Sequence, residues 1–218
     1  MTSTERLKIK VAHAALEHIE DDSIVGIGTG STVQCLIEIL SQVKHKLQGC
    51  VASSLRTANA LREHGIPLYD LLAVGTVDLY IDGADEVTAS RMMIKGGGGA
   101  LTREKILAVA ANRFICIVDD AKYVERLGVF PVAVEVLPMA RSLVGRELVK
   151  LGGTPMYREG YVTDNDNIIL DVYDLDLTSP LEMEENLKQI TGVVDSGLFI
   201  KRRADVVLVA GEQGVTSF

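Results

Sequence analysis

The chain has 218 residues, of which 47% are hydrophobic, and a formal net charge of −8. This length is enough for one substantial core, or for one domain with a smaller lobe. The acidic balance argues against nucleic acid as a partner, because phosphate backbones select basic faces, and the lack of Trp argues against an aromatic platform for bases. No run of 18 apolar residues occurs and the start has no apolar signal region, so we expect no membrane partner and a cytoplasmic protein.

Helical and strand patterns alternate in the first half of the chain. Helical spacing of apolar residues predicts helices, and short apolar runs predict strands buried on both faces. In chain order we expect a helix at 5–19, a strand at 23–28, a helix at 32–48, a strand at 49–53, a helix at 58–64, strands at 66–69 and 79–82, a helix at 101–112 and a strand at 114–118. This alternation indicates a mainly parallel sheet with helices on both faces.

The pattern changes near residue 130. We expect a strand at 132–136, a helix at 139–151, strands at 155–158 and 168–173, a helix at 179–190 and a strand at 193–200. Ser179 and Glu182 have the spacing of a capping box, with proline at the first helical position. The order β-α-β-β-α-β is that of a ferredoxin-like lobe. The apolar segment 204–210 returns to the first sheet, so the expected domains are 1–129 with 203–218, and an inserted α/β lobe at 130–202.

The cysteines and histidines offer no metal-ligand pattern. Cys35, Cys50 and Cys116 lie among apolar residues without a C-x-x-C pair, which is typical of reduced, buried cysteines in a cytosolic protein. The four histidines form neither H-x-x-x-H nor H-E-x-x-H. We therefore expect no built-in zinc site.

A glycine-rich loop, Gly26–Thr32, joins the first expected strand to a helix. Glycines allow close backbone approach, and the helix N-terminus favours an anion such as a phosphate. The dinucleotide fingerprint fails twice, because Ser31 replaces its third glycine and the next strand ends in Ser53–Ser54 in place of an acid. A monophosphate or polyol, held also by Thr57, fits better, although a plain glycine turn with a helix cap has the same pattern.

Two carboxylates, Asp82 and Asp85, follow a buried strand with Gly83 and Ala84 between them. Ligands of parallel sheets gather at the carboxyl ends of strands, where such acids bind sugar hydroxyls or transfer protons. A loop stabilised by Asx turns is the simpler alternative. A divalent metal between the two acids is the least favoured, since hard cations need more oxygen ligands.

Lys95 opens a run of four glycines, Gly96–Gly99, and Glu104 follows in the first turn of the next expected helix. Four consecutive glycines lose much backbone entropy on folding, which favours a loop that exposes N–H groups to an oxyanion beside the lysine charge. Glu104 is suited to be a general base, or else simply complements the helix dipole. Together these residues indicate proton transfer on a small anionic substrate.

These motifs resemble ribose-5-phosphate isomerase of the A type. The resemblance covers nearly the whole chain in order and spacing, through Gly28–Thr32, Asp82–Glu86, Lys95–Gly98, Leu101–Lys105, Val136–Ala140, Val162–Asn165, Gly192–Val194 and Gly197–Phe199. It implies a Rossmann-like domain with the smaller lobe, and interconversion of D-ribose 5-phosphate and D-ribulose 5-phosphate, a step of the pentose phosphate pathway. It also implies a cis-enediolate intermediate, no metal or organic cofactor, and a homodimer or, in some members, a tetramer.

By position, the resemblance makes Glu104 the base that moves a proton between C1 and C2. Asp82 and Asp85 then handle ring opening and the hydroxyl protons, and Lys95 with the glycine N–H groups stabilises the enediolate oxygens. The substrate-binding positions that it implies are Lys8, Thr29, Gly30, Ser31, Thr32, Asp82, Gly83, Ala84, Asp85, Lys95, Gly96, Gly97, Gly98 and Lys122. Without the resemblance, Lys8 and Lys122 are ordinary surface lysines.

Two other functions are compatible with these residues. A sugar-phosphate sensor without catalysis would have a similar fold, but no basic DNA-binding segment precedes residue 20. An acyl-CoA transferase would use Glu104 as a nucleophile. The short chain and the phosphate-sized first loop argue against the transferase.

Overall fold

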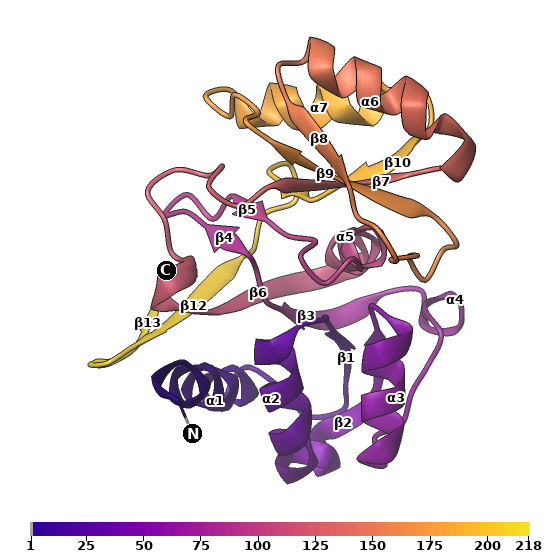
Figure 1. The fold of residues 1–218 in the computed structure, drawn as a ribbon. Helices are drawn as coiled ribbons and strands as arrows, with labels where there is room; N and C mark the ends of the chain where they lie inside the picture. The colour runs from indigo at the N-terminus through magenta and orange to yellow at the C-terminus, as the bar shows by residue number, and fades with distance from the viewer. Residues whose placement is uncertain (1) are drawn as a thin grey trace. The chain divides into compact units, whose positions relative to one another are not determined.

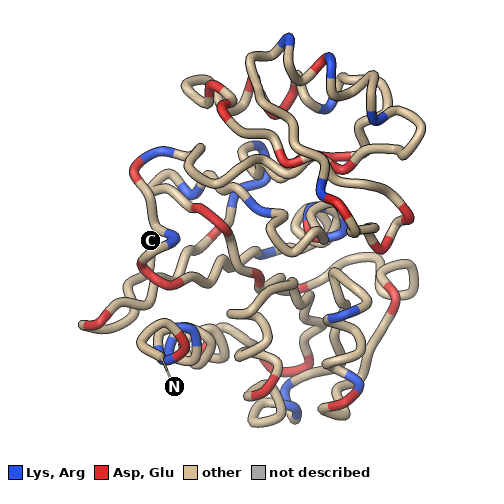
Figure 2. The backbone as a smooth tube through the Cα atoms, viewed as in Figure 1, with Lys and Arg blue, Asp and Glu red and all other residues tan. Residues whose placement is uncertain are grey.

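The computed structural model describes residues 2–218, which divide into two compact units. The first unit contains residues up to Ala84, then Arg103–Tyr123 and Ala204–Phe218, and the second contains Asp85–Thr102 and Val124–Arg203. The chain therefore passes into the second unit directly after Ala84 and returns directly after Thr102. Within residues 2–218, no helix is long and apolar enough to cross a membrane. Residues of both charge signs are interspersed along the trace of each unit (Figure 2).

The first unit is built on a six-stranded sheet of order β13-β12-β6-β3-β1-β2 (Figure 1). All neighbours pair in parallel except β13, which pairs antiparallel with β12. Its strands are β1 (Ser23–Ile27), β2 (Leu47–Ala52), β3 (Val77–Asp82), β6 (Ala111–Asp119), β12 (Val206–Gly211) and β13 (Gly214–Ser217). Its helices are α1 (Ser3–Leu16), α2 (Ser31–Leu40), α3 (Leu55–Glu63), α4 (Leu71–Val74) and most of α5 (Leu101–Ala110). The expected mainly parallel sheet is confirmed, and so is the return of 204–210 to it as β12.

The core of this unit explains why its strands are apolar throughout. Strand β1 is buried along almost its whole length, and residues of α1 and α2 such as Val11 and Leu36 are fully buried against the sheet. A central parallel strand is covered on both faces, so it reads as a continuous apolar run. Helix α1 begins at a capping box in which Thr2 and Glu5 bond each other's backbone N–H groups.

The second unit contains a four-stranded antiparallel sheet of order β10-β7-β9-β8, with α6 and α7 on one face (Figure 1). Its elements are β7 (Val132–Val136), α6 (Arg141–Lys150), β8 (Thr154–Tyr157), β9 (Ile168–Tyr173), α7 (Pro180–Gln189) and β10 (Val193–Ser196). This chain order and strand order are those of the ferredoxin-like lobe expected from the sequence. Alternate residues of β7 point to opposite faces, so Val134 packs with the helices while Ala133 packs with Leu101, on the first turn of α5.

A small sheet of order β11-β5-β4 also belongs to the second unit. Its strands are β4 (Glu86–Val87), β5 (Met93–Ile94) and β11 (Leu198–Phe199), which pair antiparallel. Because β11 holds β5 and β4, residues 85–102 group with the second unit, and that unit resumes at Val124. The expected boundaries differ here, since they put 85–102 in the first domain and begin the lobe at 130.

The strand expected at 193–200 is interrupted, and this prediction was wrong. Gly197 divides it into β10 and β11, which lie in different sheets. Gly197 N–H donates to Ala133 O at 2.7 Å, and Gly197 O accepts from Lys95 N at 2.8 Å. A Cβ on Gly197 would lie 2.0 Å from Lys95 O. Only glycine therefore allows the chain between β10 and β11 to lie this close to the Lys95 backbone.

Other predicted boundaries also need correction. The helix expected to Gln48 ends at Leu40 and continues as a 3₁₀ turn (Ser41–Lys46), after which β2 begins. The strand expected at 66–69 is only an isolated bridge from Leu68 to Cys50. Ser179 makes no side-chain cap bond, so the expected capping box does not form, although proline does occupy the first turn of α7. Helix α5 ends two residues early, because its continuation already pairs in β6.

Candidate active site

In the first unit, the candidate residues follow the carboxyl ends of adjacent parallel strands. Strands β1 and β3 are neighbours in the sheet, and the chain order reverses between them. This is the position where open α/β sheets bind ligands. The loop at Gly28 follows β1, and Asp82 ends β3.

Asp82 is fully buried and lies against the first glycine loop. Its Oδ1 accepts hydrogen bonds from Thr29 N at 3.1 Å and from Gly83 N at 2.7 Å. A Cβ on Gly28 would lie 1.9 Å from the same oxygen, so glycine is required for this approach. The backbone therefore holds the Asp82 carboxylate in one orientation, and the structure brings together two of the predicted segments.

Tyr80 donates the third hydrogen bond to Asp82, with 2.5 Å between its hydroxyl and Oδ2. The pKa of Tyr80 is raised well above its ordinary value, first by complete burial and then by the negative charges of Asp82 and Glu104. The phenol therefore stays protonated and acts as a donor. Glu104 is also buried in this unit, with 3% of its surface exposed. Tyr80 and Asp82 thus form a buried hydrogen-bonded pair, and Glu104 is a second buried carboxylate of the first unit.

A network of hydroxyl groups fixes the first glycine loop. The Thr29 hydroxyl lies 2.7 Å from that of Ser53 and 2.8 Å from that of Ser54, and Thr57 donates to Gly28 O at 2.7 Å. Ser54 also caps α3 by accepting from Thr57 N. These hydroxyls bond one another and the loop, so they support its shape, and Ser53, Ser54 and Thr57 are buried.

Lys8 reaches the N-terminus of α2 from helix α1. Its Nζ donates to the Ser31 hydroxyl at 2.8 Å, in an exposed position. Gly30 caps α2 with φ of 142°, a conformation that favours glycine, and Thr32 follows in the first turn. An ammonium group beside a helix N-terminus makes this end of the loop suitable for an anion. Lys122 lies in a 3₁₀ turn (Asp120–Lys122) directly after β6, the neighbour of β3.

In the second unit, Asp85 holds the second glycine loop. Its Oδ2 accepts from Gly97 N at 2.8 Å, and its own N–H donates to Ile94 O at 2.9 Å. Lys95 is 2% exposed, and its Nζ lies 5.5 Å from the centre of the Phe199 ring. Within the loop, Gly96 and Gly99 are buried while Gly97 and Gly98 are exposed. The second unit thus brings Asp85 and the glycine loop together, with a buried lysine charge directly before the loop.

Comparison with known protein families identifies the family of this chain. A family model described as ribose 5-phosphate isomerase A (phosphoriboisomerase A) matches residues 49–214. The chain belongs to this family. It is therefore an aldose–ketose isomerase that acts on a sugar phosphate, and the resemblance seen in the sequence motifs is confirmed.

Individual relatives agree with the family. A ribose-5-phosphate isomerase A of Legionella pneumophila (strain Corby) is 59% identical over 211 residues, which cover 97% of this chain and 98% of that protein. The crystal structure of ribose 5-phosphate isomerase A from Neisseria gonorrhoeae is 44% identical, with a TM-score of 0.98 over 100% of this chain and 98% of that one. A D-ribose-5-phosphate isomerase solved in complex with phospho-erythronic acid is 36% identical, with a TM-score of 0.94 over 100% and 99% of the two chains.

Several residues beside the isomerase motifs could not be selected from the sequence. Tyr80 was expected only as part of a strand. Residues two apart on a strand point to the same face, and this spacing was the indication in the sequence that Tyr80 contacts Asp82. Arg158 and Tyr161 bond the carbonyl groups of Gly96 and Gly98, which lie 62 and 63 residues earlier in the chain. No pattern in the sequence indicates that contact.

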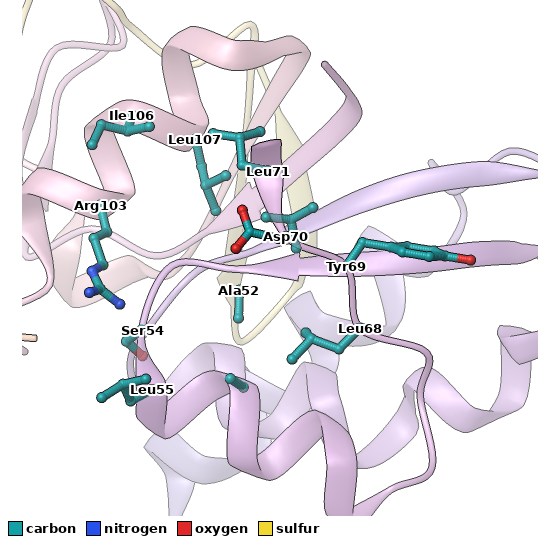
Figure 3. Close-up of a pocket in the computed structure, with 12 residues that line it drawn as sticks. Ala52, Ser54, Leu55, Leu68, Tyr69, Asp70, Leu71, Arg103, Ile106 and Leu107 are labelled. Carbon is teal, nitrogen blue, oxygen red and sulfur yellow. The ribbon is translucent and has the colours of Figure 1, made fainter. Parts of the chain in front are cut away.

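A pocket of about 320 Å³ in the first unit lies beside the isomerase motif on α5 (Figure 3). Most of its lining is apolar, including Leu55, Leu68 and Leu107, and Arg103 extends across it toward Ser54. Arg103 therefore faces this pocket, although it directly precedes Glu104. Among residues 2–218, no group of three or more His, Cys, Asp or Glu side chains is arranged to hold a metal ion.

Proposed function

We propose that this chain interconverts D-ribose 5-phosphate and D-ribulose 5-phosphate through a cis-enediolate, with Glu104 as the general base and without a metal. The burial of the Glu104 carboxylate, in the same unit as the buried Tyr80–Asp82 pair and in a chain of the isomerase family, is the observation that carries the proposal. Further support comes from the relative that was solved in complex with phospho-erythronic acid. That compound is a phosphorylated sugar acid, and it shares phosphate and hydroxyl groups with a pentose phosphate.

Glu104 removes a proton from one carbon of the open-chain sugar and returns it to the next. An aldose and its ketose differ by the position of one carbon-bound proton and one oxygen-bound proton, so a single carboxylate can serve both carbons. Glu104 is 3% exposed, so its carboxylate is held among protein groups in a defined position, as a general base requires. Its place in the first turn of α5 also puts it at the positive end of a helix dipole.

Asp82 and Asp85 transfer the hydroxyl protons during ring opening and enediolate formation. Three donors fix the Asp82 carboxylate, which suits a group that must accept a hydroxyl proton in one defined direction. Asp85 is fixed by Gly97 N–H, so its carboxylate has a set orientation as well. Precise placement of such groups lowers the entropy loss in the reacting complex.

Positively charged groups also belong to this proposal. Lys95 and the N–H groups of Gly96–Gly98 stabilise the negative enediolate oxygen. Lys8 and the α2 N-terminus at Ser31 bind the phosphate, because an ammonium and unpaired helix N–H groups both favour an anion. The remaining assignments from the resemblance, namely Thr29, Gly30, Thr32, Gly83, Ala84 and Lys122, belong to the substrate contacts in the same proposal.

Exchange with heavy water tests the mechanism. Purified protein with ribose 5-phosphate, EDTA and D₂O should produce ribulose 5-phosphate and introduce deuterium at the carbon beside the carbonyl. Rapid conversion without deuterium would indicate hydride transfer and exclude the enediolate. Loss of turnover with EDTA would exclude the metal-free mechanism.

Glu104→Gln tests the base directly. Because a positioned general base contributes roughly 10²–10⁴-fold, we expect kcat to fall by about that factor while the fold is retained. Glu182→Gln is the matched control, since Glu182 is also a first-turn helix glutamate and is exposed. Near wild-type turnover in Glu104→Gln would remove Glu104 from the mechanism.

The expected homodimer, or tetramer, and the cytoplasmic location remain part of this proposal. Light scattering on the purified protein tests the assembly, and a monomer at working concentration would contradict it.

A further inference from the structure

The glycine loop of the second unit is held by its carbonyl oxygens. Arg158 Nη1 donates to Gly96 O at 3.1 Å and to Gly97 O at 3.3 Å. The Tyr161 hydroxyl donates to Gly98 O at 3.0 Å. Three successive carbonyl groups are therefore bound by two side chains from one segment of the lobe.

Arg158 is itself fixed in place. Its Nε and Nη2 donate to the two oxygens of Asp171, at 2.8 and 2.5 Å, and these side chains are only 18% and 16% exposed. Its guanidinium lies 5.5 Å from the centre of the Tyr161 ring. A bidentate pair of this kind fixes the plane of the guanidinium, which a lysine could not do. The donors that face the loop therefore have a defined direction.

The lack of a side chain at Gly99 leaves room for Tyr161. A Cβ on Gly99 would lie 2.1 Å from the Tyr161 hydroxyl, and φ of Gly99 is 78°, which favours glycine. Gly99 N–H donates to Gly96 O at 2.9 Å and closes a turn. Flexibility alone would not require such close contact between the loop and a tyrosine.

Fixing the carbonyl groups also fixes the N–H groups. In a planar trans peptide, C=O and N–H point to opposite sides. The N–H of Gly97 donates to Asp85, and that of Gly99 closes the turn. The Gly97–Gly98 peptide has its carbonyl on Arg158, so its Gly98 N–H points away from Arg158, at an exposed position of the loop.

We propose that Arg158 and Tyr161, held by Asp171, are positioning residues for catalysis. They orient the peptides of the glycine loop so that the Gly98 N–H is directed at the oxyanion that forms during isomerisation. This inference rests on the proposed function, and it identifies residues of the lobe that act on the reaction through the loop backbone.

Two substitutions and two matched controls test the inference. Tyr161→Phe removes one hydroxyl donor, and we expect kcat to fall about five- to tenfold. Arg158→Lys keeps the charge but loses the fixed fork, and we expect about a 10²-fold fall, the usual effect of losing one oxyanion donor. The KM for ribose 5-phosphate should change less than about twofold in both, because the ground-state substrate carries no oxyanion. The controls are Tyr157→Phe and Arg141→Lys, an arginine–tyrosine pair of the same unit whose guanidinium lies 4.9 Å from its ring centre.

The inference requires a fall in kcat in Tyr161→Phe that the Tyr157→Phe control does not share. If Arg158→Lys does not fold, Tyr161→Phe decides alone. Unchanged kcat, a rise in KM only, or equal losses in the controls would each overturn the inference. Wild-type turnover with deuterium incorporation is measured first, so failure of the proposed function is seen separately from failure of the positioning role.

Discussion

Glu135 allows one prediction to be worked out from the structure in detail. It lies on β7 with no exposed surface, and its carboxylate accepts hydrogen bonds from four side chains. Oε1 accepts from Thr163 Oγ1 at 2.8 Å, Asn165 Nδ2 at 3.0 Å and Asn167 Nδ2 at 2.9 Å, and Oε2 accepts from Thr102 Oγ1. Thr102 lies in the first turn of α5, so Glu135 ties that turn and the 163–167 turn to the sheet.

The two simplest substitutions should differ strongly. Glu135→Ala removes the acceptor of three buried donors, on Thr102, Thr163 and Asn167, at about 1 kcal/mol or more each, so the free energy of unfolding should fall by at least about 3 kcal/mol. Glu135→Gln keeps an oxygen for the three donors on Oε1, and the Thr102 hydroxyl can rotate to accept from the new amide. The weaker neutral bonds are offset because a buried charge is removed, so the loss should be only about 1 kcal/mol.

Urea denaturation of both variants measures this difference. The exposed Glu182→Ala serves as control and should change stability by less than about 0.5 kcal/mol. A loss below about 1 kcal/mol in Glu135→Ala, or equal losses in the two Glu135 variants, would show that the four bonds do not stabilise the fold to this extent.

Three further predictions concern single contacts. Gly197→Ala places a Cβ 2.0 Å from Lys95 O, so we expect a loss of about 3 kcal/mol in thermal unfolding, and an unchanged Tm would contradict the described junction. Tyr80→Phe removes the phenol that donates a hydrogen bond to Asp82. We expect kcat to fall about tenfold and the free energy of unfolding to change by less than about 2 kcal/mol. An unchanged kcat would show that Tyr80 does not belong to the active site. Burial raises the pKa of the Cys50 thiol from 9.0 to about 12, so its stability contribution is present below pH 9 and is lost as pH rises toward 12. The free energy of unfolding should fall in that window by about 1 kcal/mol per pH unit, and Cys50→Ala should have a shallower slope; identical slopes would refute the assignment.

The parts of the fold that could be predicted from the sequence are those with a repeating apolar pattern. Strand β3 and helix α3 follow from local periodicity, and so does the ferredoxin-like order of the lobe. The strand that Gly197 interrupts could not be predicted, because its two halves pair with partners far away in the chain, at Val134 and Met93. Short strands such as β4 contain only two residues and have no period to detect.

In the candidate site too, some residues could be predicted from local sequence patterns and others could not. Glu104, Lys95 and the glycine loops could be selected because their residue types are unusual for a plain turn or helix start. The contacts of Arg158 and Tyr161 with the loop depend on how the lobe folds, and neither residue lies in a motif. The Ser179 cap failed for a related reason: the spacing of a capping box is local, but Ser179 adopts φ of −117° and ψ of 70°, from which its side chain does not cap the helix.

The discontinuous order of the two units has a consequence for synthesis on the ribosome. Strand β6 is flanked by β3 and β12, and β12 (Val206–Gly211) is synthesised only after the whole of the second unit. The short strands β4 and β5 must likewise wait for β11 (Leu198–Phe199). A nascent chain that ends before Leu198 lacks both β11 and β12, so one edge of the apolar strand β6 has no partner strand while the second unit is being synthesised. Such an edge is a binding site for a chaperone or for a neighbouring nascent chain.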